Sequence, residues 1–298
     1  MNEFIKEFIN YLSTEKKMSQ NSQDAYRRDI LEFSRIIQEK QNLDLDEASK
    51  TEVVAHMLQL KNTGKSSATV NRKAASLRAF YNFMTEKNYI SENPAVNIKS
   101  PKIERKSIEY LTVDEIDMLL SIPDGSIKGL RDKAILELLY ATGIRVSEIV
   151  EMNVVDVNLR MGFVTCTGEH GKARIIPMGR PCRAAVEEYI YEVRPKFIKK
   201  SEDADSPNAL FLNFSGKRLT RQGLWKMLKE YAKSVGIENR LTPQILRNSF
   251  AVHMIQNGAD IKSLQELLGH EDISATQIYL SVAKNRIKEV YDKSHPRA

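Results

Sequence analysis

The segment between Leu267 and Tyr279 contains residue types that can act on a phosphate group. Gly269 is followed directly by His270, and Tyr279 comes nine residues after that histidine. A tyrosine hydroxyl can attack as a nucleophile and form a covalent intermediate, and an imidazole can donate a hydrogen bond to an anion. We interpret Tyr279 as the attacking group and His270 as a phosphate ligand. The alternative is simple packing, because helix–glycine corners are common and a tyrosine near the start of a helix usually lies in a core.

Two arginines lie where local structure would hold them rigidly. Arg145 falls between a helix that we expect to end at Gly143 and a second helix that begins at about residue 147. Arg247 and Gln244 are three residues apart in the first turn of a helix that begins at Thr242. A fixed guanidinium suits bidentate binding of a phosphate, and the positive end of a helix favours an anion. The alternative for Arg145 is a surface arginine beside a corner.

Basic residues are concentrated in one stretch of the chain. Nine basic and three acidic residues lie between Lys65 and Lys106, and this excess of six equals the net charge of the whole chain, +6. Such a stretch is typical of a surface that binds a polyanion, although a solvated helix face followed by a linker would give the same pattern. On the helix expected from about residue 66 to 84, one polar face would contact a groove of duplex DNA. Its candidate contacts are Lys65, Thr69, Arg72, Lys73 and Ser76.

The composition is that of a globular protein with two domains. The sequence has 298 residues, with 42% hydrophobic and 28% charged residues, and no apolar run approaches 18 residues. We therefore expect a cytoplasmic protein without a membrane association. Cys166 and Cys182 suggest neither a disulfide framework nor a metal-ligand pattern, and the five histidines lack zinc-ligand spacing. We expect no metal and no cofactor.

Periodic apolar positions predict a mainly α protein. Residues 1–98 indicate an N-terminal helical domain, 99–108 a basic, proline-containing linker, and 109–298 an α-rich domain with a small antiparallel β-sheet. The β signal is a hairpin formed by 162–167 and 173–178, with its tip at 168–172 and a possible third strand at 210–212. A helix is expected at 182–197, and the helical spacing around Trp225 predicts that this side chain lies in the core. Two basic domains on a linker can close around a rod-shaped ligand.

With these residues in place, the chain resembles the tyrosine recombinase (phage integrase) family, and within it the Xer recombinases. The resemblance extends over essentially the whole chain. The segments that carry it are Ala25-Tyr-Arg-Arg-Asp29, Tyr140-Ala-Thr-Gly-Ile-Arg-Val-Ser-Glu148, Leu246-Arg-Asn-Ser-Phe-Ala-Val-His253, Leu267-Leu-Gly-His270, Thr276-Gln-Ile-Tyr279 and His295-Pro-Arg-Ala298. It implies an N-terminal SAM-like core-binding domain and a C-terminal catalytic domain.

The resemblance also implies roles for particular residues. Tyr279 would be the nucleophile that forms a 3′-phosphotyrosine and releases a 5′-hydroxyl. Arg145 and Arg247 would bind the scissile phosphate, and His270 would donate another hydrogen bond to it. The implied partner is double-stranded DNA at a specific recombination site, bound by a tetramer of this chain alone or with a related recombinase. A helix at 283–291 would dock on the neighbouring protomer, or pack on its own domain.

Two positions depart from the family pattern. Glu169 stands at the hairpin tip where the family has the lysine that acts as general acid, and Gln244 stands where the family has a histidine. Lys172, at the other edge of the same tip, is our candidate for the general acid, with a plain contact to the DNA backbone as the alternative. The departures leave open a second interpretation, a DNA-binding partner that no longer cleaves. Chromosome dimer resolution is the expected role, with integration of a mobile element as the alternative.

Overall fold

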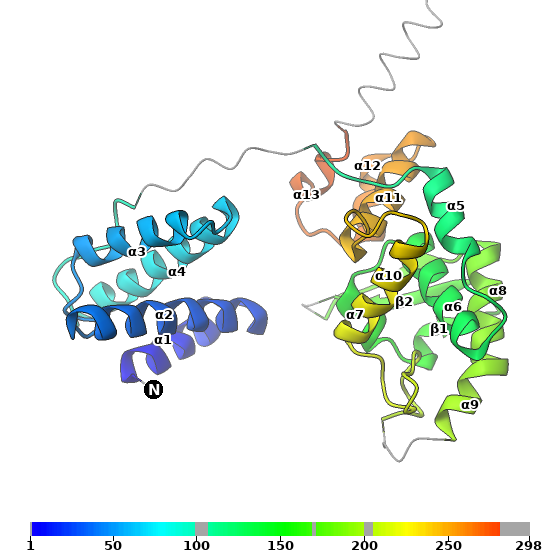
Figure 1. Ribbon diagram of the computed structural model, residues 1–298, viewed down its shortest axis with the longest axis horizontal. Helices are drawn as coiled ribbons and strands as arrows, with labels where there is room; N and C mark the ends of the chain where they lie inside the picture. The colour runs from blue at the N-terminus through cyan, green and yellow to red at the C-terminus, as the bar shows by residue number, and fades with distance from the viewer. Residues whose placement is uncertain (1, 99–106, 169–170, 200–204, 281–298) are drawn as a thin grey trace, which may run out of the picture. The chain divides into compact units, whose positions relative to one another are not determined.

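The computed structural model describes residues 2–98, 107–168, 171–199 and 205–280. The chain divides into two compact units, Met1–Lys106 and Ser107–Ala298 (Figure 1), and each unit has its own hydrophobic core. Within the described ranges, no helix is long and apolar enough to cross a membrane. Most of the expected linker (99–108) lies outside the described residues, which exclude 99–106.

The described part of the N-terminal unit is a bundle of four helices, in agreement with the helical domain expected from the sequence. Its helices are α1 (Glu3–Thr14), α2 (Gln20–Gln41), α3 (Lys50–Asn62) and α4 (Ser67–Glu86). Local signals set their ends: Asn2 caps α1, Ser49 and Glu52 form a capping box on α3, and Ser66 caps α4. Apolar side chains of all four helices meet in one core, which includes Phe8, Phe33, Val53, Leu60, Leu77 and Phe80.

The polar face of α4 is not as exposed as the sequence suggested. Lys73 and Ser76 are buried, at 6% and 0% exposure, because Asp29 of α2 lies opposite them. The Ser76 hydroxyl donates to Asp29 Oδ2 over 2.8 Å, and Lys73 Nζ lies 3.3 Å from Asp29 Oδ1. Arg72 also donates to Asp29, but Arg72 itself remains exposed to solvent. The expectation that Lys73 and Ser76 lie on a solvent-facing surface is therefore wrong, because a buried carboxylate needs cationic and hydroxyl partners.

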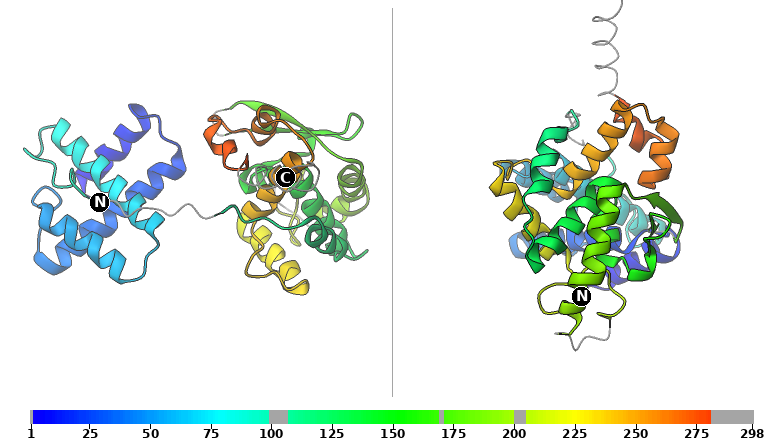
Figure 2. Two further views of the ribbon diagram at one scale, coloured as in Figure 1. Left: turned by 90° about the horizontal axis from the view of Figure 1, so that it is seen from above. Right: turned by 90° about the vertical axis from the view of Figure 1, so that its right-hand side faces the viewer.

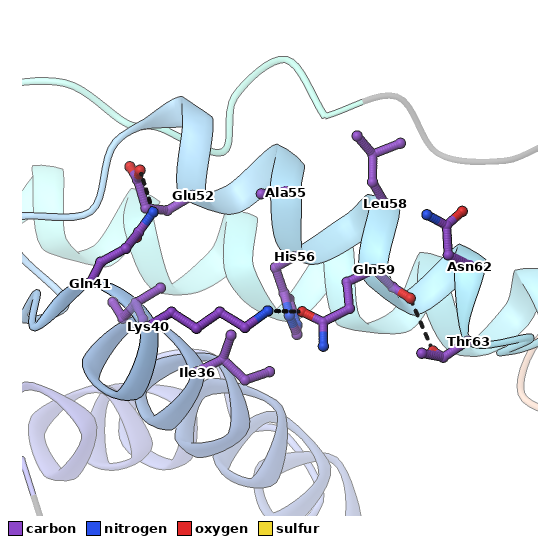
Figure 3. Close-up of a pocket in the computed structure, with 11 residues that line it drawn as sticks. Ile36, Lys40, Gln41, Glu52, Ala55, His56, Leu58, Gln59, Asn62 and Thr63 are labelled. Atoms are coloured by element: carbon purple, nitrogen blue, oxygen red, sulfur yellow. Dashed lines mark hydrogen bonds between the residues drawn. The ribbon is translucent and has the colours of Figure 1, made fainter.

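A groove of about 460 Å³ runs between α2 and α3. Lys40 Nζ donates to Gln59 Oε1 over 2.9 Å between the two helices, and His56 also lines the groove (Figure 3). His56 is only 2% exposed, its ring packs on Phe33, and its Nδ1 has no hydrogen-bond partner. Burial lowers the pKa of His56 to about 4, so this histidine is neutral at physiological pH.

The C-terminal unit is built around α6 (Ile127–Thr142), which packs against α5 (Val113–Ser121), α8 (Arg180–Glu188) and α11 (Pro243–Gln256) (Figure 1). Thr112 and Glu115 form a capping box on α5. The short helix α7 (Val146–Glu151) follows α6, and a 3₁₀ turn, η1 (Val154–Asp156), precedes the sheet. The core joins these helices to the inner face of the sheet through Leu138, Ile149, Val164 and Ile176.

The described strands form one antiparallel sheet in the order β1-β2-β3, comprising β1 (Val157–Asn158), β2 (Phe163–Thr167) and β3 (Ala173–Pro177). The expected hairpin is confirmed, with Cys166 opposite Arg174, and it lies at the edge of the unit (Figure 2). The third strand is not 210–212, whose end residue Leu212 makes an isolated bridge to Arg218 instead.

Helices cover the remainder of the unit. The expected helix at 182–197 is split into α8, a π-helical segment η2 (Tyr189–Val193) and α9 (Arg194–Ile198). On α10 (Arg221–Ser234), Trp225 is 39% exposed, so the expectation of a core position is wrong. The chain then forms α11, α12 (Ile261–Leu268) and α13 (Ser274–Gln277). These last three elements, the segment that follows α13, the hairpin, and α7 with the turn before it supply the residues of the site.

Candidate active site

Arg145 is fixed by the turn between α6 and α7. Gly143 ends α6 in the left-handed conformation expected from the sequence, with φ 58°. A side chain there would meet Phe250, because a Cβ would lie 2.3 Å from its ring. Arg145 then caps α7: its backbone N–H donates to Glu148 Oε2 over 2.7 Å, and its Nη1 donates to Glu148 Oε1 over 3.0 Å. Glu148 therefore holds both ends of Arg145.

Glu148 is a buried carboxylate whose charge is supported by its neighbours. Burial would raise its pKa, but hydrogen bonds from Arg174 and from the backbone of Arg145 outweigh that effect and lower it. The group is therefore ionised at physiological pH.

Arg247 lies in the first turns of α11, which begins at Pro243 after the cap residue Thr242. It is 4% exposed, and burial together with repulsion from Arg145 lowers its pKa to about 10. The guanidinium thus stays cationic. It donates to the carbonyl of Gly143, to Leu268 O over 2.6 Å, and to His270 Nε2 over 3.1 Å. Arg247 thereby connects α6, α11 and the end of α12.

The C-terminal end of α12 gathers three arginines. Gly269 ends the helix at φ 62°, and the N–H groups of Gly269 and His270 bond to the carbonyls of Glu266 and Gln265. No N–H group of the helix remains to donate to the next three carbonyls. Leu267 O accepts from Arg174 Nε (2.8 Å), Leu268 O from Arg247 Nη2 (2.6 Å), and Gly269 O from Arg145 Nη2 (2.9 Å). The negative end of the helix thus brings three cations to one place.

His270 follows this helix end and is neutral. Burial and the nearby arginines lower its pKa to about 4. Because Arg247 can only donate, His270 Nε2 accepts, and its Nδ1 donates to Thr276 Oγ1 over 2.8 Å. In this state His270 does not present a proton to a phosphate through Nε2. A bound phosphate would offset the arginine charges and favour a proton on that nitrogen.

Tyr279 is buried in this structure, at 1% exposure, within a small cluster that includes Phe250, Leu264 and Leu268. Its hydroxyl donates to Asn248 Oδ1 over 3.1 Å. Burial raises the pKa of Tyr279. The preceding helix α13 begins at Ser274, whose backbone N–H donates to Asp272 Oδ1 over 2.8 Å. Attack on a phosphate requires the segment that carries Tyr279 to expose the hydroxyl.

A cavity of about 790 Å³ lies beside the arginines, lined by Arg145, Arg174, His270, Lys172 and neighbouring residues. The structure therefore brings the exposed Lys172 to the same cavity as Arg145 and His270. Gln244 is exposed and its amide donates to Asn248 Oδ1 over 2.9 Å, so its polar group is directed to the residue that holds Tyr279. Glu169 lies outside the described residues.

Three residues of this arrangement were not identified from the sequence: Glu148, Arg174 and Asn248. Glu148 had a local signal, because a glutamate at the third helical position can accept a hydrogen bond from the backbone N–H of the residue that precedes the helix, here Arg145. Arg174 and Asn248 had none, because their partners come from distant segments.

Models of two families match the chain. The phage integrase family matches residues 109–286, and the phage integrase N-terminal SAM-like domain matches residues 5–88. The chain belongs to the phage integrase family. It is 43% identical to a tyrosine recombinase XerD of Oceanobacillus iheyensis, with 99% of this chain and 98% of the relative covered. A tyrosine recombinase XerD of Listeria innocua is also 43% identical, with both chains fully covered.

A solved structure shares the fold of this integrase-family chain. The XerH site-specific recombinase, bound to a palindromic difH substrate in a post-cleavage complex, aligns with a TM-score of 0.76 at 20% identity, covering 96% of this chain and 94% of that one. The resemblance and the fold class expected from the sequence are therefore confirmed.

Proposed function

We propose that this chain is a site-specific DNA recombinase that cuts and rejoins strands through a 3′-phosphotyrosine at Tyr279. One observation carries the proposal: Arg145, Arg247 and His270 meet at the end of α12, and the same segment leads directly to Tyr279. Family membership and full-length similarity to proteins named tyrosine recombinase XerD support it.

The charge of the site suits phosphoryl transfer. Three guanidinium groups (Arg145, Arg174 and Arg247) and the Glu148 carboxylate leave two net positive charges, since His270 is neutral. Negative charge grows on the phosphate oxygens in the pentavalent transition state. Cations held in place beforehand stabilise that charge without reorganising during the reaction. Arg145 and Arg247 would bind the non-bridging oxygens, and His270 would donate to one of them.

The bonds balance without an energy source. The Tyr279 oxygen forms a bond to phosphorus, the bond from phosphorus to the 5′-oxygen breaks, and that oxygen takes up a proton. The phosphodiester is exchanged for a phosphotyrosine of similar energy, so a free 5′-hydroxyl can reverse the step and rejoin the strands. Neither ATP nor a metal enters this scheme. Lys172 is the proposed donor of the proton to the 5′-oxygen, because it lines the cavity with Arg145 and His270.

The N-terminal unit would contact DNA phosphates through Lys65 and Arg72, and Thr69 would meet a base edge. Lys65 and Arg72 are exposed, whereas Lys73 and Ser76 act inside the unit by holding Asp29. Each phosphate contact removed by an alanine substitution should lower affinity and reduce the salt dependence of binding by about one unit of slope. A specific double-stranded site and a tetramer, of this chain alone or with a related recombinase, complete the proposal.

Chromosome dimer resolution is the role that the similarity to XerD proteins favours, and it would place the chain in the cytoplasm with the chromosome. Integration of a mobile element would use the same residues. The two are separated by the DNA that is recombined: a single chromosomal site common to the species supports the first, and the ends of an excised element support the second.

A nicked duplex that loses its 5′-hydroxyl fragment after cleavage tests the enzymatic proposal. Wild type should accumulate a covalent protein–DNA adduct, and Tyr279→Phe should form none. Tyr191→Phe, which changes an exposed tyrosine of η2, should form the adduct as wild type does. Tight DNA binding without any adduct from wild type would instead support the second candidate, a DNA-binding partner that does not cleave, which Gln244 and Glu169 motivate.

A further inference from the structure

The hairpin supplies an arginine that the proposed chemistry does not yet use. Arg174 of β3 donates from Nη1 to Glu148 Oε1 over 2.7 Å and from Nη2 to Glu148 Oε2 over 2.8 Å. Its Nε donates to Leu267 O over 2.8 Å. One side chain thus joins three segments that are distant in sequence: the hairpin, the start of α7 and the end of α12.

We propose that Arg174 is a positioning residue that neutralises Glu148 and so leaves the charge of Arg145 available for the phosphate. The inference rests on the proposed recombinase function. Arg174 itself is committed to other partners: three of its five N–H groups bond to Glu148 and Leu267, and its side chain is 13% exposed. It therefore acts through Glu148 and Arg145 rather than on the substrate.

The electrostatic reason lies in how Glu148 is shared. Its two oxygens accept the bidentate fork of Arg174, and they also accept the backbone N–H and Nη1 of Arg145. Among the described residues, both Arg145 and Arg174 form ion pairs with Glu148. Without Arg174, Arg145 would be left to balance the Glu148 carboxylate. A buried carboxylate would then hold Arg145 as a closed ion pair, and the group formed by the three arginines and Glu148 would lose one of its two net positive charges.

Packing shows that the place of Arg174 is specified. A Cβ on Gly269 would lie 2.9 Å from Arg174 Nη1 and 3.0 Å from its Cζ, so the absence of a side chain at Gly269 makes room for the guanidinium. Lys172 precedes Arg174 by two residues in the same hairpin and lines the same cavity. The anchor at Arg174 thus fixes the hairpin from which Lys172 extends.

The test uses the nicked suicide duplex at saturating DNA, together with DNA affinity and thermal midpoints. Arg174→Gln should bind DNA within about threefold of wild type and form the adduct about 100-fold more slowly, the loss expected when a phosphate ligand is misplaced. Arg174→Lys keeps a charge opposite Glu148 but not the fork, and should show an intermediate rate. The matched control is Arg218→Gln, because Arg218 also pairs with a carboxylate (Asp205) and caps backbone carbonyls, but away from the cavity. It should lose stability and keep its rate.

A rescue separates the electrostatic role from a structural one. In Arg174→Gln, the further change Glu148→Gln removes the uncompensated carboxylate while keeping an oxygen for the N–H groups of Arg145, so the double variant should be at least tenfold faster than Arg174→Gln alone. A wild-type rate for Arg174→Gln, or a double variant no faster than the single one, overturns the proposal while the recombinase function stands. No adduct from wild type overturns both.

Discussion

Asn248→Ala should make the recombinase react faster. In the DNA-free structure the hydroxyl of Tyr279 donates to Asn248 Oδ1 over 3.1 Å, and the tyrosine is 1% exposed. Attack on a phosphate requires this hydroxyl to leave its partner. The hydrogen bond therefore stabilises the resting state relative to the reactive one, and its removal favours the reactive one.

The size of the effect follows from the kind of bond. A hydrogen bond between neutral groups contributes about 1 kcal/mol net, which corresponds to a factor of about five in an equilibrium constant at room temperature. The fraction of chains with a released Tyr279, and with it the rate of adduct formation, should rise about fivefold. The partner bond from Gln244 adds little, because Gln244 is exposed and its amide can bond to water instead.

The assay is single-turnover adduct formation on the nicked duplex at saturating DNA. Asn257→Ala serves as the control. The Asn257 side chain also makes a hydrogen bond, from Nδ2 to His253 O of α11 over 2.9 Å, but this bond does not involve Tyr279. Its rate should equal that of wild type. If Asn248→Ala instead slows the reaction tenfold or more at unchanged DNA affinity, Asn248 assists the attack and the reasoning is refuted.

Three further predictions concern the general acid, pH and a glycine. Lys172→Ala should slow adduct formation by about 10²–10⁴-fold at similar DNA affinity; an unchanged rate would remove Lys172 as the acid. Folding lowers the pKa values of His56 and His270 from 6.5 to about 4. Between these pH values the unfolded chain binds more protons than the folded chain. The free energy of unfolding, measured with urea, should therefore fall as the pH is lowered from about 6.5 towards 4. His56→Leu should lessen that loss, and an equally steep loss in this variant would contradict the assignment to His56. Gly143→Ala combines a positive φ with a clash against Phe250, whereas Gly236 has a positive φ and open space; the thermal midpoint should fall clearly further for Gly143→Ala than for Gly236→Ala, and equal shifts would exclude the clash.

Much of the fold was readable from the sequence because local interactions determine it. The capping box at Thr112, the left-handed glycines at Gly143 and Gly269, and the cap at Asp260 each depend on residues within a few positions of one another. The hairpin likewise joins strands that are adjacent in the chain. Such features hold in almost any tertiary context.

The sequence misled where a distant segment decides the environment of a side chain. The spacing of Lys73 and Ser76 put them on a polar face, but Asp29, more than 40 residues earlier, turns that face into a buried contact. Trp225 follows the apolar spacing of its helix, yet its side chain is 39% exposed. The segment 210–212 was expected to be a third strand of the sheet, but its Leu212 forms an isolated bridge to Arg218 instead.

By itself, the sequence singled out the candidates for the chemistry: Tyr279, His270, Arg145 and Arg247 stood out by their types, their spacing and the resemblance to the family. Only the tertiary structure decided how they are held. Three successive carbonyls at the end of α12 each needed a donor, and arginines from α11, from β3 and from the turn before α7 supplied them. Likewise, the burial of Tyr279 against Asn248 arises from packing between α11 and the segment after α13. Unpaired backbone groups and buried hydroxyls are satisfied by whatever donors and acceptors the fold brings near, and no local pattern records that choice.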